Sequence, residues 1–561
     1  MLDSSEWPLF VGQLRRHPWR VPGLGLTLLG MIGRRVAQRL RIRLQADVHR
    51  GFKQRPQWLP RVAADASAAR DLRLPRLPLT GVLPEVLPAA LRADDPEAYF
   101  ARHRWSACAL ALGDEVRARA AFAEVRTWLK QPPDRADAAW ESYSCCERVV
   151  NLALLLAAHP TLPSEIDGAE LQTFFSESAA WIDDHLEYYG AVRTNNHFLN
   201  NGRALVVAGC VLGHDAWLMT GLSIVERFAP ELFATDGCLR EGSSHYQLIV
   251  AGWLFDVLLF ASMALPAERL THLEVLARSV GQACARFATV LPQMNQHIGD
   301  ISPDLHPRLT LARLLLLYGE RLSEIAPGAR LDEWLFAQRG ASALIARCVR
   351  RWPQPHTTHA HADLGGFLWL HAGRPILADA GRQDYLPRPE TRAQLGPAAH
   401  NTLMVNGVGA LAASVLRVGL WYPRPYANAR VEVETATEGF SLSHDGFQRV
   451  PGVGRHRRDV NLVDGGLDVV DELQGSGNVE LALYWHFAPG WYEDGAGALV
   501  SPSGRLRLDV NGAQGARLVW ADYNCSMAYG EAELARRLTI TWRAELPCRI
   551  HTQIHFEPCA A

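Results

Sequence analysis

The spacing of apolar residues divides the chain into a helical part and a strand-rich part. Between about residues 90 and 335, apolar side chains recur every three to four positions over stretches of helical length. The predicted helices are Ala101–Leu112, Glu115–Leu129, Trp140–Ala158, Leu171–Tyr189, Asn201–Leu212, Ala216–Phe228, Tyr246–Leu265, Leu270–Leu291 and Arg308–Tyr318. A run of paired helices without strands indicates an α/α toroid or a solenoid. No fixed-period repeat is visible, which disfavours a regular solenoid.

Beyond about residue 340 the pattern changes to short runs in which apolar and polar residues alternate. Turns that contain Gly and Asp, such as Asp464-Gly465-Gly466, separate these runs. The predicted strands are Gly366–His371, Thr402–Val405, Val431–Thr435, Val460–Val463, Leu467–Val470, Leu481–Phe487, Leu506–Val510, Arg517–Tyr523, Leu538–Trp542 and Ile550–Phe556. Many short strands of this kind are typical of an antiparallel β-sandwich.

These two patterns predict an α+β multidomain protein. We expect a Pro- and Arg-rich arm over residues 1–90, an (α/α) toroid domain over residues 91–335 and an antiparallel β-sandwich domain over residues 336–561.

Composition narrows the class of protein. The 561 residues include 57 Lys and Arg against 59 Asp and Glu, a net charge of -2, which argues against a nucleic-acid-binding protein. Hydrophobic residues make up 48%, so the chain is globular rather than disordered. The 10 cysteines are scattered without a C-x-x-C pair, which argues against a thiolate zinc site, and we expect buried thiols.

The N-terminal arm carries a basic and apolar segment. Arg15, Arg16 and Arg20 precede the apolar run Val21–Ile32, which is too short to span a bilayer and lacks a clear cleavage site. Residues 24–44 suit a basic amphipathic helix, either as a peripheral membrane anchor or, as we expect, packed on the body of the protein. We expect no transmembrane segment and a cytoplasmic location, with the periplasm as the alternative.

Two polar clusters precede or open predicted helices. The first, residues 193–202, holds four Asn residues and His197, which suits either a helix cap or the floor of a polar pocket. The second, residues 236–247, runs into a helix that Ser243 or Ser244 would cap. Tyr246 would then lie in the first helical turn, where the helix dipole favours a phenolate.

A third cluster, residues 356–363, contains an H-x-H pair. If it is a strand, His359, His361 and Asp363 share one face, because side chains alternate. One of these two histidines, together with Asp379 and His400, which follow in the chain, would give a zinc set of two imidazoles and a carboxylate, while the other histidine could face substrate.

The residue types favour β-elimination over hydrolysis. In a uronic acid the C5 proton lies α to a carboxylate, so its removal needs donors that stabilise the charge that develops there, together with a base and an acid. Asn, His and Tyr supply these groups. Glycoside hydrolysis instead needs a carboxylate pair, for which Glu241 with Asp300 is the candidate.

Several motifs resemble the heparinase II/III-like polysaccharide lyases in the order expected. They are Trp140-Glu141-Ser142-Tyr143 with Arg148 and Asn151, Asn195-Asn196-His197 with Gly202-Arg203-Ala204-Leu205, Glu241-Gly242-Ser243 with Tyr246, His359-Ala360-His361-Ala362-Asp363, Asp379-Ala380-Gly381 and His400-Asn401-Thr402. The resemblance implies an incomplete (α/α) toroid followed by an antiparallel β-sandwich, with an acidic polysaccharide or oligosaccharide bound between them.

The resemblance also implies roles. Asn196 would neutralise the substrate carboxylate, His197 would be the base or a carboxylate binder, and Tyr246 would be the acid or both acid and base. His359 would support carboxylate neutralisation. Substrate contacts are expected from Asn195, Arg148, Glu241 and Arg240, and a structural zinc is expected on His361, Asp379 and His400.

We therefore expect a carbon–oxygen lyase that cleaves a uronic-acid-containing glycan. The alternatives are a glycoside hydrolase on the same scaffold and a non-catalytic glycan-binding protein of exopolysaccharide assembly.

Overall fold

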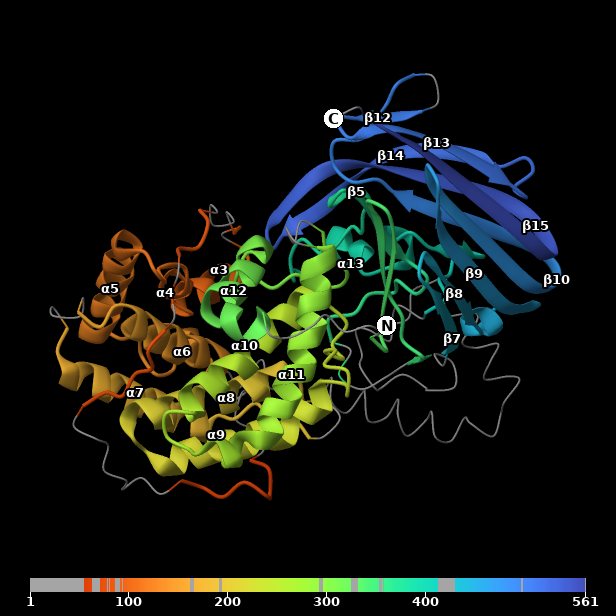
Figure 1. The fold of residues 1–561 in the computed structure, drawn as a ribbon. Coiled ribbons are helices and arrows are strands. Elements are labelled where there is room, and N and C mark those ends of the chain that lie inside the picture. Colours follow the sequence, from red (N-terminus) through yellow and green to blue (C-terminus); the bar gives the residue numbers. More distant parts are fainter. Residues whose placement is uncertain are drawn as a thin grey trace.

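A computed structural model shows a helical half and a sheet half that lie side by side (Figure 1). It describes residues 55–62, 71–77, 79, 81–85, 91–92, 94–161, 166–190, 194–291, 296–323, 331–352, 356, 358–411, 429–495 and 498–559. The basic segment 24–44 of the predicted arm lies outside the described residues.

The predicted helical region is confirmed. Its helices are α3 (Pro96–His103), α4 (Ser106–Leu110), α5 (Glu115–Lys130), α6 (Ser142–Ala158), α7 (Gly168–Asp184), α8 (Asn196–Leu212), α9 (Asp215–Leu232), α10 (Ser244–Ala261), α11 (Ala267–Val290) and α12 (Pro307–Ser323). The single helix predicted over residues 101–112 is wrong. The chain breaks at Trp105, whose φ of 54° is left-handed and whose indole is buried against Phe174.

Helices α8 and α10 form the centre of the helical half. By length and composition α10 is apolar enough to cross a membrane, but 89% of it is buried inside the protein, as in the core helix of a globular domain. Helix α8 packs against α9 through glycines. A Cβ on Gly221 would lie 2.5 Å from the Gly202 carbonyl oxygen, so the two backbones approach too closely for any side chain there.

The strand-rich half contains two antiparallel sheets, as the alternating pattern predicts. The smaller has the order β1-β2-β4-β5 and the larger the order β11-β12-β13-β15-β10-β9-β8-β7-β3, with β14 paired to β15 and β6 to β10. The strands are β1 (Trp334–Arg339), β2 (Ser342–Arg347), β3 (Arg351–Trp352), β4 (Phe367–His371), β5 (Arg374–Leu377), β6 (Leu403–Val405), β7 (Ala429–Ala436), β8 (Gly439–His444), β9 (Val453–Val463), β10 (Gly466–His486), β11 (Tyr492–Glu493), β12 (Leu499–Ser501), β13 (Gly504–Asn511), β14 (Arg517–Ala528) and β15 (Glu531–Pro558).

Four of the predicted strands are parts of two long ones. Strand β10 has 21 residues and joins the runs predicted over 467–470 and 481–487, and β15 has 28 residues and joins those predicted over 538–542 and 550–556. Between the two predicted runs of β10, Gly475 and Gly477 have positive φ and lie where the β10–β15 register shifts. They form a bulge within one strand instead of ending it.

The small sheet is buried on both faces. In β4, Leu368 and Leu370 belong to the helical core, whereas Phe367 and Trp369 belong to the core of the large sheet. Alternation along the strand sends neighbouring side chains to opposite faces, so one strand contributes to both cores. The last helix of the helical half ends at Ser323 and β1 begins at Trp334, two residues before the predicted domain start at 336.

The close α8–α9 contact predicts a cost for any side chain at Gly221. In Gly221→Ala the new Cβ would also lie 2.6 Å from the Val206 backbone nitrogen, so the helices must separate. We expect a loss of about 1–3 kcal/mol in stability and a lower melting temperature. The matched control is Gly319→Ala in α12, where no atom lies within 4 Å of the added Cβ. An unchanged melting temperature for Gly221→Ala would contradict this packing.

Candidate active site

The first polar cluster opens helix α8. The helix begins at Asn196, five residues earlier than predicted, and the Asn195 side chain accepts a hydrogen bond from the His197 backbone nitrogen at 3.2 Å. Asn195 is therefore the N-cap, which places Asn196 and His197 in the first helical turn.

Glu241 holds Asn196 at two points. The backbone nitrogen of Asn196 donates to Glu241 Oε1 at 2.9 Å, and its Nδ2 donates to Oε2 at 2.6 Å. Glu241 is 0% exposed, so the prediction that it contacts substrate is wrong. Its carboxylate instead orients the amide of Asn196, because a buried charge needs donors close by.

His359 enters the same place from the strand-rich half. Its Nε2 lies 3.4 Å from Asn196 Nδ2, and its ring stacks on Tyr246 with the centroids 3.7 Å apart. Its backbone is fixed as well, since its nitrogen donates to the Glu241 carbonyl and its carbonyl accepts from the Asp300 nitrogen, both at 3.0 Å. The structure thus brings Asn196, Tyr246 and His359 together.

Tyr246 lies in the first turn of α10, which Ser243 caps, as predicted. Its hydroxyl lies 2.8 Å from that of Tyr385, and Tyr385 donates to the Ile301 carbonyl oxygen at 3.0 Å. Burial and the negative charge of Asp304 raise the pKa of Tyr246 well above its usual value, and the hydrogen bond to Tyr385 opposes this shift. At neutral pH Tyr246 is therefore a neutral phenol that can donate a proton.

His197 is the most exposed of the four predicted catalytic residues. Its side chain is 36% exposed, and its ring centroid lies 4.6 Å from that of Tyr143. Burial would lower the pKa of His197, but the charge of Glu187, whose Oε1 lies 3.1 Å from Nδ1, raises it to about 9. His197 is therefore a cation at neutral pH, suited to binding an anion.

Asp300 joins this group of side chains to the predicted metal set. Its carboxylate contacts His359, His361 and Arg382, and its side chain is 3% exposed. Burial would raise the pKa of Asp300, but Arg382 and the hydrogen bonds from both histidines outweigh it and hold that pKa well below the usual range.

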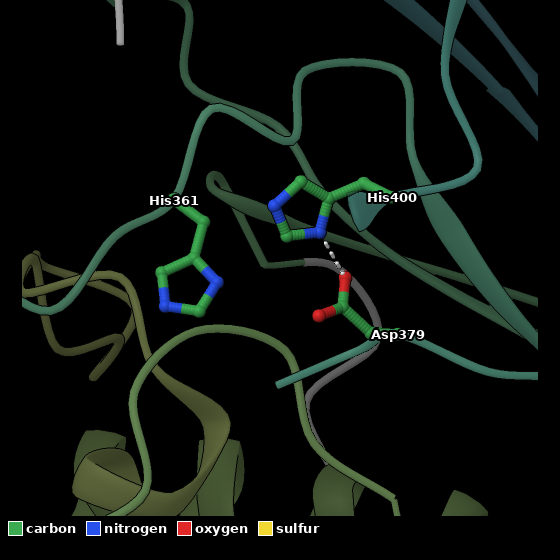
Figure 2. Close-up of side chains that lie close together, drawn as sticks. All are labelled: His361, Asp379 and His400. Atoms are coloured by element: carbon green, nitrogen blue, oxygen red, sulfur yellow. Dashed lines mark hydrogen bonds and ion pairs between the residues drawn. The ribbon is translucent and has the colours of Figure 1, made fainter. Parts of the chain in front are cut away.

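The predicted metal ligands lie together (Figure 2). One ligand atom from each of His361, Asp379 and His400 lies within 4.8 Å of the others, and all three residues are buried. His361 Nδ1 and His400 Nε2 are buried nitrogens without a hydrogen-bond partner among the described residues. Two unpartnered imidazole nitrogens beside a carboxylate fit the ligand chemistry of zinc.

The H-x-H segment is not the predicted strand. Residues 358–366 form a loop, and Asp363 lies near Arg347, at 3.7 Å, rather than with the histidines. His359 and His361 nevertheless both reach Asp300, because this loop wraps around its carboxylate.

The prediction that Arg148 contacts substrate is also wrong. Arg148 is fully buried in α6 and donates to the carbonyl oxygens of His103 and Ala139. Arg240 is half-buried and donates to the Glu231 carbonyl oxygen at the end of α9, and its contact with substrate stays a prediction. Both guanidinium groups donate hydrogen bonds to backbone carbonyl oxygens, and a sequence motif alone does not reveal such contacts.

Sequence reasoning missed Glu187, Tyr385 and Arg382. Arg382 and Tyr385 lie a few residues after the Asp379-Ala380-Gly381 motif. Their closeness to that motif in the sequence is a weak signal that they lie near the site. Glu187 carries no local signal, because it lies between helices and meets His197 only through the fold.

Comparison with known proteins agrees with the predicted resemblance. Residues 329–552 match the family described as heparinase II/III-like, C-terminal. A solved structure of heparinase III is similar with a TM-score of 0.58 at 17% identity, covering 83% of this chain and 78% of that one. A heparan sulfate lyase HepC mutant from Pedobacter heparinus has a TM-score of 0.53 at 17% identity, covering 84% and 78%.

No curated protein matches the chain. At 17% identity the likeness to solved structures establishes a shared fold, and it confirms the predicted combination of a helical region with antiparallel sheets.

The contact with Glu187 predicts how His197 titrates. In Glu187→Gln the neighbouring charge is lost, so we expect the pKa of His197 to fall from about 9 toward its ordinary value of 6.5. NMR titration of the ring, assigned by comparison with His197→Gln, would measure this change. Glu177→Gln removes an exposed carboxylate of α7 and should leave the titration unchanged.

The same pair affects stability in a defined pH window. Because the folded-state pKa of His197 is raised, its contribution to stability is complete below about pH 6.5 and is lost as the pH rises through about 9. If Glu187→Gln leaves the pKa of His197 near 9, another group is responsible for the shift.

Proposed function

We propose that this chain, which matches the heparinase II/III-like C-terminal family over residues 329–552 and shares the fold of heparinase III over 83% of its length, is a polysaccharide lyase that cleaves a uronic-acid-containing glycan by β-elimination. The observation that carries the proposal is the meeting of Asn196, Tyr246 and His359, with His197 in the adjacent position of the same helical turn. The substrate class is an acidic polysaccharide, in keeping with the heparan sulfate lyase named among the similar structures.

His197 and Asn196 would neutralise the carboxylate of the substrate. The C5 proton becomes acidic enough to remove only when the charge that develops on the carboxylate is stabilised. The cation of His197 supplies charge. The amide of Asn196 supplies a hydrogen-bond donor. Its contact with His359 Nε2 is long, at 3.4 Å, and therefore weak, so a substrate oxygen can take the place of His359 as the acceptor.

Tyr246 would transfer the protons. Its resting neutral phenol suits protonation of the departing O4. For a substrate whose C5 hydrogen and O4 lie on the same face, Tyr246 first loses its phenolic proton to solvent. The phenolate then takes the C5 proton, the C4–O4 bond breaks, and Tyr246 returns the proton to O4. When Tyr246 is ionised, the Tyr385 hydroxyl can turn its hydrogen from the Ile301 carbonyl oxygen to the phenolate, and this hydrogen bond lowers the pKa of Tyr246 against the effect of burial. A His197 that is protonated at neutral pH supports this role of Tyr246 over a role of His197 as base.

The carboxylates needed for hydrolysis are poorly placed. Glu241 is fully buried and bonded to Asn196, and Asp300 is bonded to two histidines and Arg382. The depressed pKa of Asp300 keeps it ionised, so it cannot serve as a general acid. These contacts favour elimination over a glycoside hydrolase.

The zinc site is proposed as structural. His361, Asp379 and His400 would hold the ion and tie together three loops of the strand-rich half. Zinc would supply rigid tetrahedral coordination there, whereas the elimination itself depends on the side chains in the cleft.

The proposed chemistry is tested with a panel of uronate polymers. Elimination creates a C4=C5 double bond, so we expect near-UV absorbance to rise together with new reducing ends. Tyr246→Phe should lower turnover by about 10²-fold or more. Tyr492→Phe, at an exposed position of β11, should keep parental turnover. Reducing ends without absorbance would indicate a hydrolase, and binding without either signal would indicate a non-catalytic glycan-binding protein.

The metal proposal is tested by elemental analysis. We expect one zinc per chain in the purified protein, lost in His361→Ala, and a lower melting temperature after chelation because the three loops lose their tie. Protein purified with zinc present but holding no stoichiometric metal would contradict the proposal.

A further inference from the structure

Asp300 is placed so that its two oxygens serve different partners. Oδ2 accepts from Arg382 Nη1 at 3.0 Å and from His359 Nδ1 at 3.1 Å. Oδ1 accepts from His361 Nε2 at 2.9 Å. The carboxylate therefore touches one histidine of the proposed active site and one histidine of the metal set.

These contacts determine which nitrogen of each ring carries hydrogen. A carboxylate oxygen can only accept, so the hydrogen must lie on His359 Nδ1 and on His361 Nε2. In neutral His359 the lone pair is then on Nε2, which faces the amide of Asn196. In neutral His361 the lone pair is on Nδ1, the buried nitrogen without a described partner that turns toward Asp379 and His400 (Figure 2).

We propose that Asp300 is a positioning residue that sets both tautomers at once, presenting Nδ1 of His361 to a metal ion and Nε2 of His359 to the substrate cleft. The inference rests on the proposed function for His359 and on the proposed zinc site for His361. It makes one buried carboxylate the link between the metal set and the site of elimination, as outer carboxylates commonly orient metal-binding imidazoles.

Arg382 determines how an Asn side chain at position 300 would be oriented. Its guanidinium is always a donor, so the side-chain oxygen of an Asn at position 300 must replace Oδ2, where Arg382 and His359 both donate. The amide nitrogen must then face His361 Nε2. Two donors would meet at 2.9 Å unless His361 moves its hydrogen to Nδ1, which removes the lone pair that a metal needs.

The test is the zinc affinity of Asp300→Asn, measured on the full chain by competition with a chromophoric chelator. We expect affinity to fall by about 10- to 100-fold. Glu241→Gln is the matched carboxamide control, because Glu241 contacts Asn196 and lies near His359 but is not bonded to His361. It should keep the zinc affinity of the parent. Parental affinity in Asp300→Asn, an equal loss in Glu241→Gln, or a parent that binds no zinc would each overturn the proposal.

A second substitution separates tautomer control from general damage. In Asp300→Asn combined with Arg382→Met, the fixed donor is gone, so the amide can turn its oxygen toward His361 and zinc affinity should recover at least partly. Further loss in the double variant would point to a structural role alone and would overturn the proposal.

A third measurement needs no change at Asp300. In zinc-free parent protein labelled with ¹⁵N-histidine, the His361 signals, assigned by difference from His361→Gln, should show hydrogen on Nε2. Hydrogen on Nδ1 would contradict the inference. None of these measurements involves glycan turnover, so an inactive chain with the expected zinc behaviour would refute the proposed function and leave the metal half of the inference standing.

Discussion

The site depends on a small sheet that is apolar on both faces. Strand β4 sends Leu368 and Leu370 into the helical core and Phe367 and Trp369 into the core of the large sheet. Burying such side chains on both sides stabilises the contact by roughly 1.5–3 kcal/mol for each one fully removed from water. Because Asn196 and Tyr246 come from helices and His359 from the loop before β4, this packing sets the distances between them.

Much of the fold follows from periodicity, and the errors have physical causes. Helix α8 was predicted to start at Asn201 because Asn residues are poor in helix interiors. In the structure Asn200 donates to Glu147, and Asn201 Oδ1 accepts from the Glu187 nitrogen, so buried partners satisfy amides that look like a loop in the sequence. The bulge at Gly475 and Gly477 likewise resembles a turn, because the same residue type serves both.

The sequence indicates which residue types gather at the site more clearly than what each one does. The cap at Ser243 and the proximity of His361, Asp379 and His400 could be predicted, since motif spacing carries them. Whether a charged side chain faces a substrate or a buried partner could not, because exposure is a property of the packed structure. Arg148 and Glu241 were predicted to contact substrate, yet each satisfies groups inside the protein.

The position of β15 bears on how the protein is made. This strand is the last element of the described chain, yet it lies inside the large sheet, paired with β10 along one side and with β13 and β14 along the other. The helices pack mainly with neighbours close in sequence, so they can assemble while the ribosome is still adding residues. The large sheet cannot be completed until this interior strand has been made, and until then the backbone edge of β10 that pairs with β15 stays open to chaperones and to other nascent chains.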